Sequence, residues 1–416
     1  MTFSPRKLLA KLHQKYPFHP LVWYIIVETA LSRMAFFMAM PFVGLRMHES
    51  TGVGLTSIGA IMGVAPLMST FAGFYVGHWS DKFGRRKIII STLYIWSLIL
   101  LGFSMASTPM EFAILMGLNG LARGVFEPVT TALISDLCAH GNAKENLQKH
   151  AFHLRYFAIN IGSSVGPLVG ATILVKSPTF GFRLAALTWF ISASVFWYLA
   201  RRWNVKGIEK TLEKATHSMA TAFKVFVKDR ALRIYLMAFF LMSFSYSQVE
   251  SIFAIHLKDT YGNPGILLFG RLLTLNGITV VLLTLPLLSW AKKYDLNKVC
   301  AASALFFCLG YFLMGQSSTP IQYYLSMIVL TIGEIVIFAN GSLMIENLAP
   351  AKMKGAYLGL SNISSVGFVI GPAIGGALLE RGGGSLLFSV LAGLMVLVSG
   401  LYLMARRQIL SAKTAR

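Results

Sequence analysis

Long apolar stretches alternate with short polar segments along almost the whole chain of 416 residues. A helix needs about 20 mainly apolar residues to cross a bilayer, and twelve stretches meet that length. They run over 21–46, 56–79, 88–106, 111–138, 151–175, 180–201, 232–257, 265–290, 298–316, 320–346, 353–379 and 384–405. The pattern predicts an all-α membrane protein with twelve transmembrane helices.

One polar segment divides this series in the middle. Most connections are short, but residues 201–231 are polar, basic and in part amphipathic. We therefore expect an N-terminal six-helix bundle over 1–200, a cytoplasmic basic linker over 201–231 along the membrane surface, and a C-terminal six-helix bundle over 232–416.

Composition excludes a soluble protein. Hydrophobic residues make up 55% of the chain and charged residues 13%, with a mean hydropathy of +0.64. A soluble domain carries about 25% charged residues, so this chain has too few charges to cover a water-exposed surface. Cys138, Cys300 and Cys308 have no spacing typical of a zinc site or a disulfide framework. No phosphate-binding loop or nucleophile motif occurs, so we expect no metal, no cofactor and no enzymatic activity.

The distribution of Lys and Arg predicts the orientation. If the N-terminus is cytoplasmic, cytoplasmic segments hold 28 of the 37 Lys and Arg residues and external segments hold five. This agrees with the positive-inside rule, so both termini are expected in the cytoplasm. The net charge of +21 is then explained by the membrane, with anionic lipid as a partner, and not by nucleic acid.

The two halves resemble each other. The fifth predicted helix contains GSSVGPLVGA at 162–171, and the eleventh contains GFVIGPAIGG at 367–376. An acidic residue, Asp136 or Glu346, lies at the cytoplasmic end of the helix before each. Such a repeat predicts two pseudo-symmetric bundles with a binding site between them near the midplane of the membrane.

The loop after the second predicted helix carries a motif. It reads GHWSDKFGRRK, in which Gly77, Asp81, Gly84, Arg85 and Arg86 are spaced as Gly-x-x-x-Asp-Lys-x-Gly-Arg-Arg. Gly84 permits a tight turn, and Asp81 can accept charge-assisted hydrogen bonds. The loop resembles the signature loop of the major facilitator superfamily. The resemblance implies the major facilitator fold and a loop that latches the two halves in one gating state.

A second motif lies in the fifth predicted helix. Gly162, Gly166, Pro167 and Gly170 form a GxxxGPxxG run, in which glycine allows close helix contact and proline bends the helix. The run is similar to the antiporter motif of the superfamily. Together with RYFAINIG, LNGITVVLLTLPL and TIGEIV, it resembles the drug:proton antiporter branch.

Ionisable residues inside a membrane are costly, and so they are candidates for function. The candidates for transport and proton coupling are Glu28, Arg33, Arg123, Glu127, Glu250 and Glu334. Arg155 and Arg271 also lie within predicted spans.

Three of these candidates have individual expectations. Arg123 and Glu127 are four residues apart on one helical face and are candidates for an ion pair. Glu334 follows Gly333 deep in an apolar helix with no cation one turn away, so it is the first candidate for exchanging a proton during transport. Some proton-coupled multidrug members of the family carry an acid in a matching Gly-Glu stretch. Glu250 lies nearer the outer end of its span, where a solvated residue at the mouth is the alternative.

The resemblance implies a monomeric secondary transporter of the cytoplasmic membrane that exports amphipathic small molecules in exchange for protons. Two alternatives remain open. One is a specific carrier for a siderophore, lipid, peptide or sugar, working in either direction. The other is a membrane sensor that kept the fold but does not transport.

Overall fold

The structure is a computed structural model of the protein. It describes residues 18–138, 144–203, 226–227, 229–350, 353, 357, 360 and 362–414. Almost all of the linker predicted over 201–231, together with the beginning of the span predicted over 353–379, lies outside these residues.

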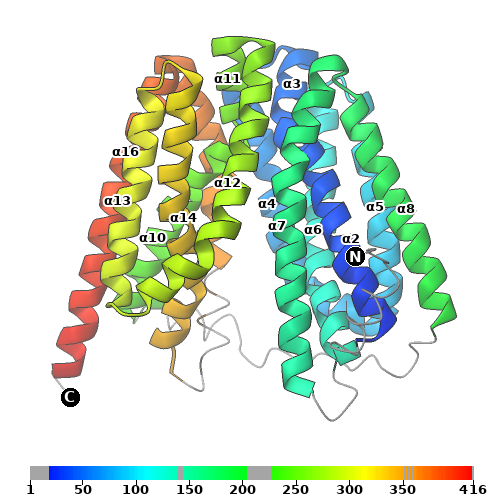
Figure 1. Ribbon diagram of the computed structural model, residues 1–416, viewed down its shortest axis with the longest axis horizontal. Coiled ribbons are helices and arrows are strands. Elements are labelled where there is room, and N and C mark those ends of the chain that lie inside the picture. Colours follow the sequence, from blue (N-terminus) through cyan, green and yellow to red (C-terminus); the bar gives the residue numbers. More distant parts are fainter. Residues whose placement is uncertain are drawn as a thin grey trace, which may run out of the picture.

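The described chain is helical, and the helices form two groups along the sequence (Figure 1). The first group is α2 (Pro20–Ala39), η1 (Met40–Phe42), α3 (Val43–Thr51), α4 (Leu55–Phe83), α5 (Arg85–Met105), α6 (Pro109–Cys138), α7 (Lys144–Lys176) and α8 (Phe180–Arg202). The second group is α10 (Arg230–Glu250), α11 (Phe253–Tyr261), α12 (Asn263–Ala291), α13 (Leu296–Gly315), α14 (Pro320–Leu348), η3 (Asn362–Ser365) and α16 (Val366–Thr414).

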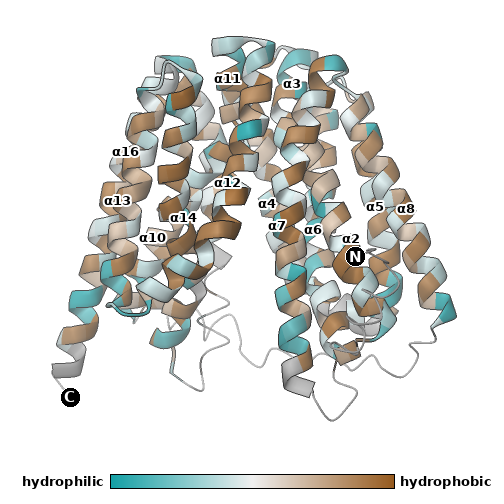
Figure 2. Ribbon diagram, viewed as in Figure 1, coloured by the Kyte–Doolittle hydropathy of each residue, from teal (hydrophilic) through white to brown (hydrophobic). Residues whose placement is uncertain are grey.

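Ten described segments are long and apolar enough to cross a membrane. α6 is not among them, because Asn119, Arg123 and Glu127 make it more polar, yet it is as long as its neighbours. α16 reverses direction at Gly382 and Gly383, where Gly383 has a φ of 64° that favours glycine. With α6 and the second pass of α16, the described residues make the twelve predicted passes. Apolar residues cover the middle of the bundle and polar residues gather toward its ends (Figure 2).

The same helix pairs recur in both groups. α2 packs on α7, α4 on α6 and α5 on α8, as α10 packs on α16, α12 on α14 and α13 on α16. The two groups meet through α4 against α16 and through α7 against α12. This arrangement is the pair of pseudo-symmetric bundles that the repeat predicts.

The first span of each group is broken on its way through the membrane. η1, which contains Pro41, separates α2 from α3, and Ser251 and Ile252 separate α10 from α11. Proline cannot donate the backbone hydrogen bond that a continuous helix needs, which explains the first break. The end of α10 at Glu250 places a carboxylate beside a helix break within the membrane.

The turns between helices lie at the two ends of the bundle, and one of them is the signature loop. We call the end with Thr51, Tyr261 and Gly382 the outer end, after the orientation that Lys and Arg predict, and the end with Gly84 the inner end. Gly84 has a φ of 81° between α4 and α5, so the tight turn of the signature loop uses the conformational freedom of glycine.

Candidate functional site

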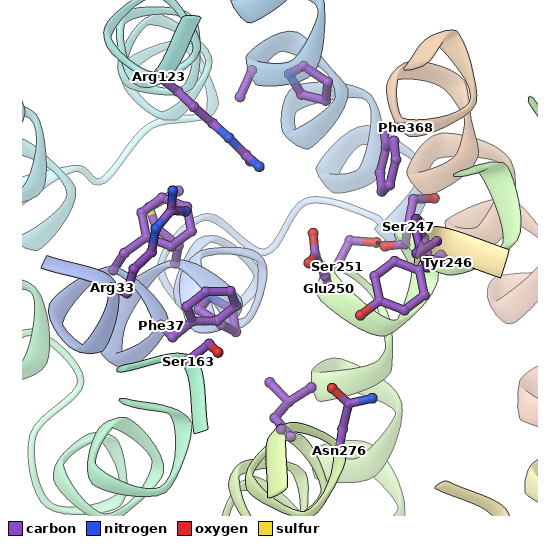
Figure 3. A pocket seen from close by; sticks show the side chains of 18 of the residues that line it. Arg33, Phe37, Arg123, Ser163, Tyr246, Ser247, Glu250, Ser251, Asn276 and Phe368 are labelled. Carbon is purple, nitrogen blue, oxygen red and sulfur yellow. Dashed lines mark hydrogen bonds between the residues drawn. The ribbon is translucent and has the colours of Figure 1, made fainter. Parts of the chain in front are cut away.

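A cavity of about 710 Å³ lies between the two bundles. Both bundles contribute lining residues, from α2, α4, α6 and α7 on one side and from α10, α12, α14 and α16 on the other. In Figure 3, Arg33 and Arg123 point into the cavity from the first bundle, while Glu250 and Tyr246 lie opposite on the second. Its position between the repeats is where transporters built from repeats bind their substrates.

A second hollow of about 410 Å³ continues from this cavity. Both are lined by Ser69, Thr70, Arg123 and Ser365, and the second also reaches Glu127 and Pro128 farther along α6. Since α6 runs from the outer to the inner end, the hollow extends toward the inner end. The cavity therefore has an approach from the side predicted to be cytoplasmic.

Glu334 lies on α14 in the wall of the cavity and accepts two hydrogen bonds from other helices. The Tyr246 hydroxyl on α10 donates to Oε1 over 3.0 Å, and Asn276 Nδ2 on α12 donates to Oε2 over 2.6 Å. Asn276 also donates to Thr331 Oγ1 at 2.9 Å. Among the described residues, Glu334 has no ion pair. A carboxyl held by neutral donors can gain or lose a proton without breaking a salt bridge.

Glu250, which could have been a solvated residue at the outer mouth, lines the same cavity as Glu334. Its side chain is exposed to this space, and no hydrogen bond or ion pair holds it among the residues that the structure describes. It interacts through space with Arg123 and Arg33. The second bundle thus places two carboxylates on the cavity.

The first bundle pairs three of its charges internally, and the pairing differs from the expected one. Glu127 forms ion pairs with Arg33 of α2 and with Arg155 of α7, the latter at 2.8 Å. Arg155 Nη1 also donates to Thr131 Oγ1 at 3.1 Å. The predicted pair of Arg123 with Glu127 was therefore wrong. Helical spacing places both residues on one face, but two arginines from other helices occupy both carboxylate oxygens.

Glu28 lies beside this network on α2. It is only 4% exposed, and its Oε1 has no hydrogen-bond partner among the described residues. It interacts through space with Arg155 and Arg33. Glu28 is therefore in the interior of the first bundle, whereas Arg33 reaches the cavity wall.

The glycines of the antiporter-like motif hold α7 against α2. A Cβ atom at Gly162, Gly166 or Gly170 would meet a backbone carbonyl oxygen of α2. Gly367 and Gly371 of α16 pack against α10 in the same way. Pro167 lies within α7, and its carbonyl approaches Gly270 of α12. The motif thus brings three helices of the cavity wall close together.

The signature loop ties the start of α5 to the inner ends of two other helices. Arg85 forms a buried ion pair with Asp136 at the end of α6. Arg86 Nη1 donates to the carbonyl oxygen of Ala200 near the end of α8 at 2.7 Å. Gly77 and Asp81 lie in the last turns of α4, but their surroundings are outside the described part. The latch role predicted for Asp81 stays a prediction.

Polar contacts join the two bundles at the outer end. Glu49 of α3 forms an ion pair with Lys258 of α11. Glu380 of α16 accepts a hydrogen bond from the Thr56 hydroxyl at 2.6 Å and from its backbone N–H at 3.3 Å. These contacts hold the bundles together on the side away from the second hollow.

Two residues of the site were not predicted from the sequence. Tyr246 and Asn276 supply the hydrogen bonds to Glu334. The ring of Tyr246 also packs edge-on against Phe338, with centroids 5.1 Å apart. A polar amide such as Asn276 in an otherwise apolar span was the available signal, because polar groups in a membrane need a partner. Among the described residues, no group of His, Cys, Asp and Glu is arranged to hold a metal ion.

Comparison with known proteins identifies the family. The sequence model of the Major Facilitator Superfamily matches residues 26–365 and, in a second match, 268–415. The uncharacterized MFS-type transporter YqjV of Bacillus subtilis (strain 168) is 31% identical, and the alignment covers 91% of this chain and 92% of that protein.

Two more distant relatives have described activities. The Na(+), Li(+), K(+)/H(+) antiporter of Planococcus maritimus is 25% identical, over 81% of this chain and 84% of that protein. The multidrug resistance protein MdtH of Klebsiella pneumoniae (strain 342) is 23% identical, over 87% of this chain and 85% of its own length.

Proposed function

Because the chain belongs to the major facilitator superfamily and is a multi-pass membrane transporter and not an enzyme, we propose that it exports amphipathic compounds in exchange for protons. We place it in the cytoplasmic membrane with both termini in the cytoplasm, acting as a monomer surrounded by anionic lipid. The relatives named for multidrug resistance and for cation/proton antiport support this class.

The observation that carries the proposal is the setting of Glu334. It is a carboxyl in the wall of the central cavity, held by Tyr246 and Asn276 and by no cation among the described residues. An uncompensated charge near the centre of a bilayer costs about 2.5–3.5 kcal/mol on insertion scales. A carboxyl group that is protonated during part of each transport cycle is neutral then and does not have this cost.

The proposed cycle couples this proton to the closing of the cavity. With the cavity open to the cytoplasm, Glu334 releases its proton there and the substrate enters. With the cavity open to the outside, the substrate leaves and Glu334 takes up a proton. Protonation removes a charge that is expensive to enclose, so the two protonation states favour different conformations.

The test is dye uptake by inside-out membrane vesicles with an acidic interior, using the aromatic cation ethidium. The parent protein should accumulate ethidium against its gradient. Glu334→Gln should abolish uphill uptake but retain exchange of ethidium down its own gradient, and Glu334→Asp should retain part of the coupling. Glu111→Gln is the matched control, because Glu111 is an exposed carboxyl at the start of α6. Uphill uptake by Glu334→Gln equal to that of the parent would exclude Glu334 as the coupling acid.

A second candidate is the exchange of monovalent metal cations for protons. It is favoured by the two carboxylates, Glu250 and Glu334, on one cavity and by the antiporter of Planococcus maritimus. The same vesicles distinguish the two candidates. Addition of Na⁺ dissipates the pH gradient if metal cations are exchanged, whereas only the dye dissipates it if the protein exports amphipathic compounds.

A further inference from the structure

Arg123 is a cation on the cavity that has no counter-ion among the described residues. It is exposed on α6 and lines both the main cavity and the second hollow. No ion pair involves it among the described residues, because Glu127, one turn away, is paired with Arg33 and Arg155. The pairing of Glu127 thus leaves the positive charge of Arg123 available to a molecule in the cavity.

Glu250 is the corresponding anion on the other bundle. It is exposed to the same cavity and has no hydrogen bond or ion pair within the described part of the chain. Figure 3 shows Arg123 and Glu250 directed into the space from opposite sides. They interact only through space. A charge within a membrane is costly without a partner. Arg123 and Glu250 can each gain such a partner from an oppositely charged group of a molecule in the cavity.

The cavity that these two charges line is largely apolar and aromatic. Phe36 and Phe37 of α2, Phe338 of α14 and Phe368 of α16 line it, and the cavity volume is about 710 Å³. Pockets of about 300–1,000 Å³ with apolar walls and a few polar groups suit drug-sized molecules. Aromatic walls bind flat ring systems well.

Glu334 differs from Glu250 in that both of its carboxylate oxygens already accept hydrogen bonds, from Tyr246 and Asn276. It is therefore less available to a ligand. The two acids can divide the work, with Glu334 exchanging the proton and Glu250 contacting the substrate.

From this arrangement we infer that the preferred substrates are aromatic zwitterions. The anionic group of the substrate pairs with Arg123, its cationic group pairs with Glu250, and its ring system packs on the phenylalanines of the cavity wall. This inference rests on the proposed export function and names its substrate class.

Three dyes with one ring system test it. Rhodamine 110 carries a cationic ring system and a free carboxylate, rhodamine 123 is its methyl ester and thus a cation, and fluorescein is an anion. In inside-out vesicles with an acidic interior, the parent should accumulate rhodamine 110 about tenfold more efficiently than either other dye, the size expected for one lost charge-assisted hydrogen bond. Efficiency is compared as initial rate over half-saturating concentration.

Substitutions assign each charge. Arg123→Gln should lower rhodamine 110 uptake to the level of rhodamine 123 and leave rhodamine 123 uptake within about twofold of the parent, because only the carboxylate partner is lost. Arg123→Lys keeps the charge and should retain part of the preference. Glu250→Gln should lower uptake of both cationic dyes but not of fluorescein. Glu111→Gln serves again as the control, and thermal unfolding in detergent verifies that each variant is folded.

The outcomes separate the two proposals. Equal uptake of rhodamine 110 and rhodamine 123 by the parent, or an unchanged dye preference in folded Arg123→Gln, would overturn the zwitterion inference while export stands. Absence of gradient-driven uptake of all three dyes and of ethidium would overturn the export proposal, and the inference with it.

Discussion

The two walls of the cavity are built from the same helix packing but carry their charges in different ways. In the first bundle, Arg33, Glu127 and Arg155 form one network, so each of these three charges has a partner within the protein. In the second bundle, Glu334 is held by neutral donors and Glu250 by no described partner. The acid of the first wall, Glu127, is therefore neutralised by arginines, whereas the acids of the second wall can change protonation state or bind a ligand.

The largest expected effect concerns the ion-pair network of the first bundle. Glu127→Gln leaves Arg33 and Arg155 without their anion, and breaking a buried ion pair costs about 3–5 kcal/mol. The Glu127 side chain is 30% exposed, which places the expected loss of unfolding free energy near the lower limit. Thermal unfolding of the purified protein in detergent measures it, and Glu334→Gln should unfold at close to the parent temperature.

A double-mutant cycle tests the partners of Glu127. Adding Arg33→Gln to Glu127→Gln should recover part of the lost stability, because the uncompensated cation is removed. Adding Arg123→Gln should give an additive effect. The opposite result, coupling to Arg123 and additivity with Arg33, would contradict the network described here.

A loss of stability of intermediate size is expected from disturbing the glycine contacts that both bundles share. Gly166→Val and Gly371→Val each place a side chain against the backbone of the first helix of their bundle. Overpacking of this kind costs about 1–3 kcal/mol, and the two losses should be similar because the contacts are equivalent. Gly400→Val is the control, since an added Cβ at Gly400 meets no atom within 4 Å. A loss at only one of the two positions, measured by thermal unfolding, would show that the halves do not pack equivalently.

The smallest effect concerns the contact between the two bundles at the outer end. Lys258→Gln removes the ion pair with Glu49. The Lys258 side chain is 26% exposed and the Glu49 side chain is 28% exposed. Such a pair contributes about 0.2–1 kcal/mol, so the outward-open population should rise by about twofold. Spin labels at Ser50→Cys and Asn263→Cys, in a cysteine-free background, measure the opening. Lys176→Gln is the control at the same end, and an equal shift in that variant would remove the specific role of Lys258.

Much of the fold could be predicted because a membrane imposes a simple length rule. The described helices match the predicted spans, and the repeat of Gly166 and Gly371 predicted which helices correspond. The break of α10 just after Glu250 could not be predicted, because no proline marks it. Its position changed Glu250 from a possible mouth residue into a residue of the cavity.

The charged residues that line the cavity and the second hollow could be predicted, but not their partners. Glu334 stood out because it is an acid in an apolar span, and the structure places it on the cavity. The partners of Glu127 come from α2 and α7, so helical spacing favoured Arg123 incorrectly. Tyr246 and Asn276 also reach Glu334 from other helices. Contacts between helices depend on how the helices rotate about their axes, which spacing within one helix does not determine.

The central claim is that Glu334 carries the exchanged proton, and proton release on substrate binding tests it most directly. The purified protein in weakly buffered detergent solution near neutral pH receives the dye that the parent exports most efficiently, and a pH indicator records the protons released. We expect the parent to release a proton for each dye molecule bound, and Glu334→Gln to bind the dye without releasing a proton. Undiminished proton release by a Glu334→Gln protein that still binds the dye would contradict it.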